Sequence, residues 1–412
     1  MELWEKVFNH PDFQEEPFVG SVYDYFRDQS YDQFHLQFDL HYVVMENPAA
    51  NYSSGYIGNV PDDSGAGLLL TELLDLTKDD IDDWSVYDWN GDGYVDQIFI
   101  LYAGKGQNDG GGAQSIWPHQ WRLSEQSEDP WNREWGHPYQ VAEGLLVDSY
   151  GAFAELTGRG TYGTFGTLCH EYSHCLGLPD IYYGSSTQVV GAWDLMDRGN
   201  TNAGGFCPPG YSAHERMLLG WVKPKEYEGT VTVDDMPPLS DAPEAGLLRN
   251  DGWPDEYYVI ENRQQNGWDA SLPGSGILIF HIDYDEAVWA TGIPNSRELK
   301  RYSIIPANNK TSTATSISKD WAYPYQDNHE LTDTSTPAAK LHHPNAEGIL
   351  LMSKPITDMA VSADGLASLV INADPTAIRQ VSAAGSHQVL YNIGPITIMR
   401  GADGTVFKVL RF

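Results

Sequence analysis

The chain reads CHEYSHCLGLPD from Cys169 to Asp180, a match to the pattern His-Glu-x-x-His-x-x-Gly-x-x-Asp. Two histidines four positions apart on a helix lie on one face, one turn apart, so His170 and His174 can both reach one zinc ion. Glu171 lies beside them and can serve as the general base for a zinc-bound water. The stretch therefore predicts a catalytic zinc site on a helix.

The flanking residues predict how this helix packs and where it ends. Apolar side chains at i, i+3, i+4 and i+7 spacing form one stripe, made of Phe165, Leu168, Cys169, Tyr172, Cys175 and Leu176. Gly177 allows the chain to leave the helix in a left-handed turn, and Pro179 prevents the helix from resuming. Asp180 can then fold back as a third ligand, which leaves a fourth position for water.

The composition restricts the class of partner. The chain has 412 residues, enough for two or three domains, with 24 Lys and Arg against 58 Asp and Glu and a net charge of -34. Such a charge repels nucleic acid and anionic membrane surfaces, so we expect neither as a partner. It suits a secreted or cell-surface protein that also holds calcium. No run of 18 apolar residues is present, so no membrane span is expected.

The N-terminus and the cysteines bear on the compartment. The chain starts with Met-Glu-Leu-Trp and shows no basic and apolar signal segment. Two interpretations stay open: a cytosolic protein, or numbering that begins after a removed signal and pro-segment. Three cysteines are too few for a disulfide framework. Cys169 and Cys175 are expected to pack on the apolar stripe, and a bridge between Cys175 and Cys207 stays open.

A second metal-binding pattern, DWNGDGYVD, runs from Asp88 to Asp96. It places side-chain oxygens at positions 1, 3, 5 and 9, a glycine at 6 and a carbonyl at 7, as in a calcium loop. The expected ligands are Asp88, Asn90, Asp92, Tyr94 (through its carbonyl) and Asp96. Position 12 is Phe99 instead of the glutamate of an EF-hand, so any further ligand comes from elsewhere, with Asp79, Asp80, Asp82 and Asp83 as candidates. The alternative is an Asp/Asn/Gly turn without an ion.

Other segments place the first half of the chain around the zinc helix. Gln97–Ala103 reads as a buried strand, and the glycine-rich stretch 104–113 lacks the context of a phosphate loop, so no nucleotide site is expected. Met196 falls in a tight turn after the helix, where a methionine forms the hydrophobic floor called a Met-turn. The segment 208–219 predicts a further helix that ends at Gly220.

Beyond residue 225 the pattern changes to short strands separated by Pro, Gly, Asn and Asp, at 256–263, 276–284, 301–307, 348–356 and 367–373. We therefore predict an α+β protein with a catalytic domain at 1–224, a β-rich, sandwich-like domain at 225–374 and a small C-terminal strand segment at 375–412. His281, Asp283 and Asp285 are able to bind metal, but the sequence favours a strand with alternating faces.

With these residues in place, the chain resembles the immune inhibitor A-like family of secreted metallopeptidases over about residues 15–310. The motifs are GSVYDYF at 20–26, the Asp88–Asp96 loop with FILYAG at 99–104, WPH at 117–119, the zinc pattern, WDLM at 193–196, PPGYSAHER at 208–216 and ENRQQ at 261–265.

This resemblance implies a zinc-dependent endopeptidase of metzincin-like fold, with a twisted mixed sheet and an active-site helix, secreted as a zymogen and stabilised by calcium. It implies His170, His174 and Asp180 as zinc ligands and Glu171 as general base. The tail 396–412 is similar to C-terminal segments of secreted proteins from the Bacteroidetes, which suggests a role for it in secretion.

Three functions are weighed. The leading hypothesis is hydrolysis of peptide bonds in a protein or peptide substrate, with Tyr182 and Tyr183 as alternative helpers for the oxyanion. A zinc amidase acting on cell-wall peptides would share the site, and only substrate profiling separates the two. The third is a calcium-stabilised binding or adhesion protein with an inactive metal site. The intact Glu171 argues against it, because an inactive site has no chemical need for the base.

Overall fold

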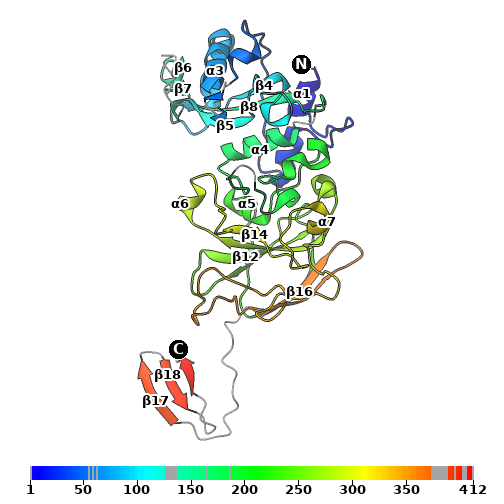
Figure 1. Ribbon diagram of the computed structural model, residues 1–412, viewed down its shortest axis with the longest axis vertical. Coiled ribbons are helices and arrows are strands. Elements are labelled where there is room, and N and C mark those ends of the chain that lie inside the picture. The colour runs from blue at the N-terminus through cyan, green and yellow to red at the C-terminus, as the bar shows by residue number, and fades with distance from the viewer. Residues whose placement is uncertain are drawn as a thin grey trace.

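The computed structural model describes residues 2–53, 56–57, 60–61, 64–125, 137–162, 165–184, 187–372, 388–393, 396–400 and 406–410. It has several small sheets and few helices, so the chain is a mixed α/β protein (Figure 1). Over these residues, no helix is both long enough and apolar enough to span a bilayer.

The described helices are short apart from two. These are α1 (Glu2–Asn9), α2 (Val22–Gln29), α3 (Ser64–Thr77), α4 (Phe165–Cys175), α5 (Ala213–Leu218), α6 (Glu286–Trp289) and α7 (Thr315–Ser318). The zinc pattern lies on α4, as predicted. The predicted helix at 208–219 is wrong in its first half. Ser212 is the N-cap, and its side chain accepts the backbone N–H of Glu215, so the helix begins at Ala213.

Two small sheets form the first half. One has the order β4-β8-β5, in which β4 and β8 are parallel and β5 is an antiparallel edge strand; the other has the order β3-β7-β6. Their bounds are β3 (Tyr94–Val95), β4 (Phe99–Lys105), β5 (His119–Arg122), β6 (Tyr139–Ala142), β7 (Leu145–Val147) and β8 (Ser149–Leu156). A hairpin of β1 (Tyr56–Ile57) and β2 (Val60–Pro61) precedes α3. The strand expected at 97–103 is β4.

The second half is built on a five-stranded sheet of order β14-β13-β12-β11-β9 and a three-stranded sheet of order β10-β16-β15. Their bounds are β9 (Lys225–Glu226), β10 (Thr230–Met236), β11 (Gly246–Arg249), β12 (Glu256–Arg263), β13 (Gly276–Asp283), β14 (Tyr302–Ile304), β15 (Ile356–Val361) and β16 (Ala367–Asn372). The C-terminal segment forms a third sheet of β17 (Gln388–Ile393), β18 (Ile396–Arg400) and β19 (Val406–Leu410).

The strand predicted at 348–356 is wrong. Gly348 has a φ of +82°, and the side-chain oxygen of Asn345 accepts the backbone N–H groups of Glu347 and Ile349, so the segment turns instead of extending. The ladder of β15 begins only at Ile356.

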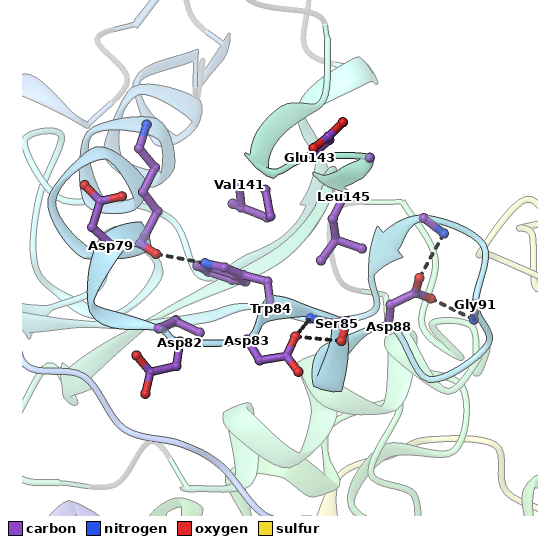
Figure 2. A pocket seen from close by; sticks show the side chains of 15 residues that line it. Asp79, Asp82, Asp83, Trp84, Ser85, Asp88, Gly91, Val141, Glu143 and Leu145 are labelled. Atoms are coloured by element: carbon purple, nitrogen blue, oxygen red, sulfur yellow. Dashed lines mark hydrogen bonds between the residues drawn. The ribbon is translucent and has the colours of Figure 1, made fainter.

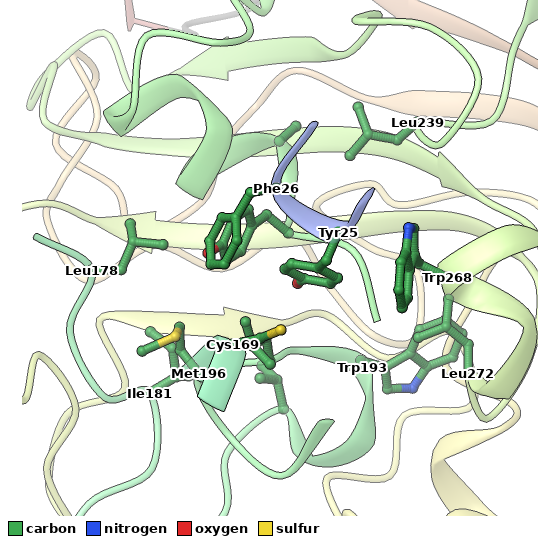
Figure 3. Packing of buried hydrophobic residues seen from close by; sticks show 14 of the residues in the cluster. Tyr25, Phe26, Cys169, Leu178, Ile181, Trp193, Met196, Leu239, Trp268 and Leu272 are labelled. Atoms are coloured by element: carbon green, nitrogen blue, oxygen red, sulfur yellow. The ribbon is translucent and has the colours of Figure 1, made fainter. Parts of the chain in front are cut away.

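The central apolar core surrounds α4 (Figure 3). Four residues of the predicted stripe are at most 2% exposed, namely Phe165, Leu168, Cys169 and Tyr172. The same cluster contains Tyr25 and Phe26 from α2, and side chains from β11, β12 and β13. This core therefore continues across residue 225, and α5 is the helix that contacts β12 of the second half (Figure 1). The division at residues 224 and 374 stays a prediction.

Candidate active site

The end of α4 is fixed by its backbone. Gly177 has a φ of +92°, its N–H donates to the carbonyl of His174, and the N–H of Leu178 donates to the carbonyl of Ser173. These two bonds make a Schellman motif, which turns the chain back across the last turn of the helix. Earlier in α4, a Cβ on Gly166 would lie 2.0 Å from the carbonyl oxygen of Asn200, so only glycine allows this close approach.

The structure brings the three predicted ligands together. Asp180 Oδ1 lies 3.2 Å from Nε2 of His170 and 3.4 Å from Nε2 of His174. Zinc bonds of about 2.0–2.1 Å in a tetrahedron place neighbouring donor atoms about 3.3–3.4 Å apart. The observed spacing therefore fits one zinc ion held by these three side chains.

The hydrogen bonds behind the histidines orient their free nitrogens. Nδ1 of His170 lies 2.9 Å from the carbonyl oxygen of Leu195, and Nδ1 of His174 lies 2.8 Å from that of Leu178. Since a carbonyl oxygen can only accept a hydrogen bond, Nδ1 carries the proton in each ring. The Nε2 atom of each ring faces Asp180 Oδ1 and is available to ligate a metal ion. Asp180 Oδ1 is buried there without a hydrogen-bond partner, which is the environment that a bound cation would satisfy.

The pKa values of His170 and Asp180 also reflect their close contact. Burial opposes protonation of His170, but the carboxylate of Asp180 outweighs it and raises the pKa of His170 to about 9. Burial also works against ionisation of Asp180, yet the two imidazoles hold its pKa well below its ordinary value. The carboxylate is therefore ionised and is stabilised by positive charge on its neighbours.

The loop that carries Asp180 is tied to the rest of the molecule. The N–H of Asp180 donates to the carbonyl of Gly292, and the N–H of Ile181 donates to that of Met196, each over 2.8 Å. Met196 is fully buried and belongs to the same core cluster as Cys169 and Ile181 (Figure 3). The role of this methionine as the floor of the site stays a prediction.

Two further side chains, those of Glu171 and Tyr182, lie close to the three predicted zinc ligands. Glu171 is 9% exposed, and no described residue hydrogen-bonds to its carboxylate. The ring of Tyr182 lies parallel to that of His170 at 6.4 Å between centroids, whereas the ring of Tyr183 faces the ammonium group of Lys300. Of the two tyrosines that sequence left as alternatives, Tyr182 is therefore the one beside the histidines.

A buried polar network under the Met196 turn was not foreseen from sequence. Asp194 accepts the N–H of Met196 at 2.8 Å and the hydroxyl of Tyr302 at 2.5 Å. Glu215 accepts the N–H of Ser212 at 2.7 Å. Burial raises the pKa of both carboxyl groups, and the nearby carboxylate of Asp194 raises the pKa of Glu215 further, so they stay protonated to a higher pH than exposed carboxyl groups do. The one local signal for this network in the sequence is the spacing of Ser212 and Glu215, which is that of a capping box.

We expect Glu215→Gln to be tolerated and to become more stable than the wild type as pH rises. A carboxyl group whose pKa is raised by folding stabilises the native state fully below the ordinary pKa of glutamic acid. This stabilisation is lost as pH rises through the raised value. The amide cannot lose this proton, while Glu215→Ala loses the cap and should cost about 0.5–2 kcal/mol. Thermal midpoints of the three proteins across pH check this. A difference between wild type and Glu215→Gln that stays constant with pH would contradict the raised pKa of Glu215.

His119 lies on the edge strand β5, which runs beside α4. Its Nδ1 is 2.6 Å from the carbonyl of Trp117, and its Nε2 is 3.1 Å from the hydroxyl of Tyr150. Both ring nitrogens are therefore engaged in holding the strand. The outer edge of β5 has no partner strand among the described residues, and Trp121 on it is 47% exposed.

The predicted calcium loop folds around its first residue. The carboxylate of Asp88 accepts the N–H groups of Gly91, Asp92 and Gly93 over 2.8–3.1 Å. Asp79, Asp82, Asp83 and Asp88 line one hollow of about 660 Å³, but Asp83 bonds Ser85 and Asp88 bonds its own loop (Figure 2). Among the described residues, these carboxylates do not form a group of three or more whose oxygen atoms lie within 4.8 Å of one another. They therefore do not converge on one point.

The cysteines are all unbridged. Cys169 is fully buried in the central core, in agreement with the packing role expected of it, and Cys175 is half-buried. The sulfur of Cys207 lies 3.3 Å from the carbonyl oxygen of Trp268, so the bridge to Cys175 that the sequence left open does not form.

Comparison with known families agrees with this site. Residues 6–219 match the family model described as immune inhibitor A peptidase M6, catalytic domain, which covers about half of the chain and all of the predicted zinc ligands. The chain belongs to the immune inhibitor A family of M6 metallopeptidases. The resemblance stated from the sequence motifs is thereby confirmed, and membership of a metallopeptidase family implies a metal ion.

Two relatives give the extent of the likeness. The chain is 30% identical over 207 residues to the pre-pro-metalloprotease PrtV of Vibrio cholerae, a match to 42% of this chain and 21% of that protein. It is 31% identical over 177 residues to immune inhibitor A of Bacillus thuringiensis, a match to 39% of this chain and 24% of that protein. The chain thus spans about a quarter or less of the length of these relatives.

Proposed function

We propose that the chain is a zinc-dependent endopeptidase with His170, His174 and Asp180 as zinc ligands and Glu171 as general base. The observation that carries the proposal is Asp180 Oδ1, a buried and unpartnered carboxylate oxygen at tetrahedral ligand spacing from two oriented imidazoles. A helix with incidental histidines has no reason to bring a carboxylate oxygen to ligand spacing from both free imidazole nitrogens.

The residues of the chain divide the chemistry among them. When bound, zinc would lower the pKa of a water molecule and polarise the scissile carbonyl. Glu171 accepts the proton of the attacking water and later donates it to the leaving amine. Tyr182, whose ring lies parallel to that of His170, donates a hydrogen bond to the developing oxyanion in this proposal. The free edge of β5 offers backbone N–H and C=O groups to an extended substrate.

The proposal includes the architecture and the location of the protein. A mixed sheet over an active-site helix with a methionine turn below it is the metzincin-like arrangement, and the sheets beyond residue 225 form the β-rich part that follows it. Secretion or display at the cell surface is supported by the net charge of -34 and by the resemblance of the tail 396–412. The tail would then act in export.

Calcium at the loop Asp88–Asp96 is a further part of the proposal. It is supported by the residue pattern and by the glycines Gly91 and Gly93, whose φ angles of +74° and +87° let the loop wrap around Asp88. We expect added calcium to raise the thermal midpoint of the wild type and not that of Asp88→Ala. Equal midpoints with and without calcium in the wild type would leave only an Asp/Asn/Gly turn.

Hydrolysis of casein tests the proposed activity. We expect cleavage by the purified chain, its loss after removal of metal with a chelator, and its return on addition of zinc in the presence of calcium. Activity that survives complete removal of zinc would refute the mechanism. Cleavage of cell-wall peptides but not of casein would favour the amidase, and bound zinc with no hydrolysis of either would favour the binding protein.

A further inference from the structure

A second group of donor side chains lies in the β-rich half of the chain. Glu256, His281 and His342 each present a donor atom, and the three atoms lie within 4.8 Å of one another. In the described part of the chain, the only other such group is the one at His170, His174 and Asp180. The sequence pattern favours an ordinary strand at 281–285, and no local pattern links it to His342, some sixty residues further on.

The second group is separate from the proposed active site because the sheet lies between them. Tyr257 of β12 and Ile282 of β13 pack in the core around α4. Glu256 and His281 are their neighbours in sequence, so they project to the opposite face, where Tyr258 and Ile279 pack in another core. The two groups therefore lie on opposite sides of the five-stranded sheet.

Glu256 is a buried anion without a permanent cationic partner. It is 0% exposed and lies opposite Asp283 in the β12–β13 ladder, which is also 0% exposed. Arg301 pairs with Asp283 at 3.0 Å, whereas no lysine or arginine among the described residues pairs with Glu256. Two opposed buried carboxylates with one guanidinium leave an uncompensated charge, which is costly in the interior of a protein.

The groups around Glu256 are neutral donors. Its oxygens accept the backbone N–H of His342 at 2.5 Å and of His343 at 3.0 Å, the amide of Asn250 at 3.0 Å, and Nε2 of His281 at 2.7 Å. Of these four donors, the imidazole of His281 is the one whose nitrogen can ligate a metal ion in place of its hydrogen bond to Glu256. A neutral imidazole is the form that ligates metals.

The second imidazole is held in place by a carboxylate. Nδ1 of His342 lies 3.0 Å from Oδ2 of Asp283, and the rings of His342 and His281 lie 4.4 Å apart between centroids. A carboxylate that orients a histidine in this way is the usual support of a metal-ligating imidazole. The loop at 342–343 thus completes a group whose other members come from two adjacent strands.

We propose that Glu256, His281 and His342 form a second metal site, which takes a divalent transition-metal ion of the zinc type. Two imidazoles and one carboxylate are the donors of such ions, while calcium and magnesium prefer a set of oxygens. The ion takes the place of the proton in the contact of His281 with Glu256, and it compensates the buried charge. It also ties the loop at 342–343 to β12 and β13, so the site is structural.

Metal stoichiometry tests the second site, with a matched pair of variants. His342 and His343 are adjacent, both contact Asp283, and their side chains are 26% and 32% exposed, but only His342 belongs to the donor group. After dialysis against zinc with excess calcium to fill oxygen sites, we expect two zinc ions per chain in the wild type and in His343→Ala. We expect one in His342→Ala. Circular dichroism checks that both variants are folded.

A second set of variants separates this site from the proposed active site. The double variant His170→Ala with His174→Ala should retain one ion, and the further change His342→Ala should remove it. One ion in the wild type together with none in the double variant would overturn the second site and leave the first intact. Equal zinc content in His342→Ala and His343→Ala would overturn it as well, and the contacts of Glu256 would then be a hydrogen-bonded network only.

Discussion

Replacement of Glu171 by glutamine is expected to abolish peptide hydrolysis while zinc stays bound. Glutamine has the shape of glutamate but cannot accept the proton of the attacking water, and loss of a general base costs about 10²–10⁴-fold in rate. No described residue hydrogen-bonds to the Glu171 carboxylate, so the exchange leaves no structural partner unpaired. The rate constant kcat on a peptide substrate and the zinc content of the same preparation check both halves of the prediction.

The control is Glu143→Gln. This carboxylate is exposed and lies in the turn between β6 and β7. It removes one negative charge from the same half of the chain and should leave the rate unchanged. If Glu171→Gln kept a wild-type rate, the base would have to be another group. If it lost zinc together with activity, the effect would reside in the metal site, and the role of Glu171 as a base would be unsupported.

The local parts of this site could be predicted from sequence because local rules determine them. The spacing of His170 and His174 follows from the helical repeat, and Gly177 and Pro179 specify where the helix ends. The turn then returns Asp180 to the histidines, as the two backbone bonds of the Schellman motif show. Helix α4 and strands β12, β13 and β16 also followed from their apolar patterns, with bounds within one residue for the three strands.

The parts that escaped prediction depend on contacts between distant segments. Tyr302 reaches Asp194 from a strand more than a hundred residues away, and nothing near either residue signals the pair. His342 joins His281 through a loop whose course no local pattern specifies. The apparent strand at 348–356 failed for the opposite reason. Its apolar residues suggested a strand, but the side chain of Asn345 supplies a local alternative to the ladder.

Replacement of Asp180 by alanine is expected to remove zinc and activity together. Its carboxylate is the only anionic member of the three predicted ligands, and Oδ1 lies within 3.4 Å of both imidazole nitrogens. Loss of a group that only supports a ligand costs about 10–100-fold in metal affinity, and loss of a ligand itself should cost more. Zinc affinity by competition with a chelator, with kcat measured at each occupancy, gives the size of the effect.

The variant Asp180→Asn separates the charge of this ligand from its shape. Asparagine retains an oxygen at the same place but no negative charge, so its zinc affinity should lie between those of alanine and aspartate. If both variants bound zinc as the wild type does, the third ligand would be a different group. If both failed equally, the charge would be the decisive contribution, as the strongly lowered pKa of Asp180 between two imidazoles suggests.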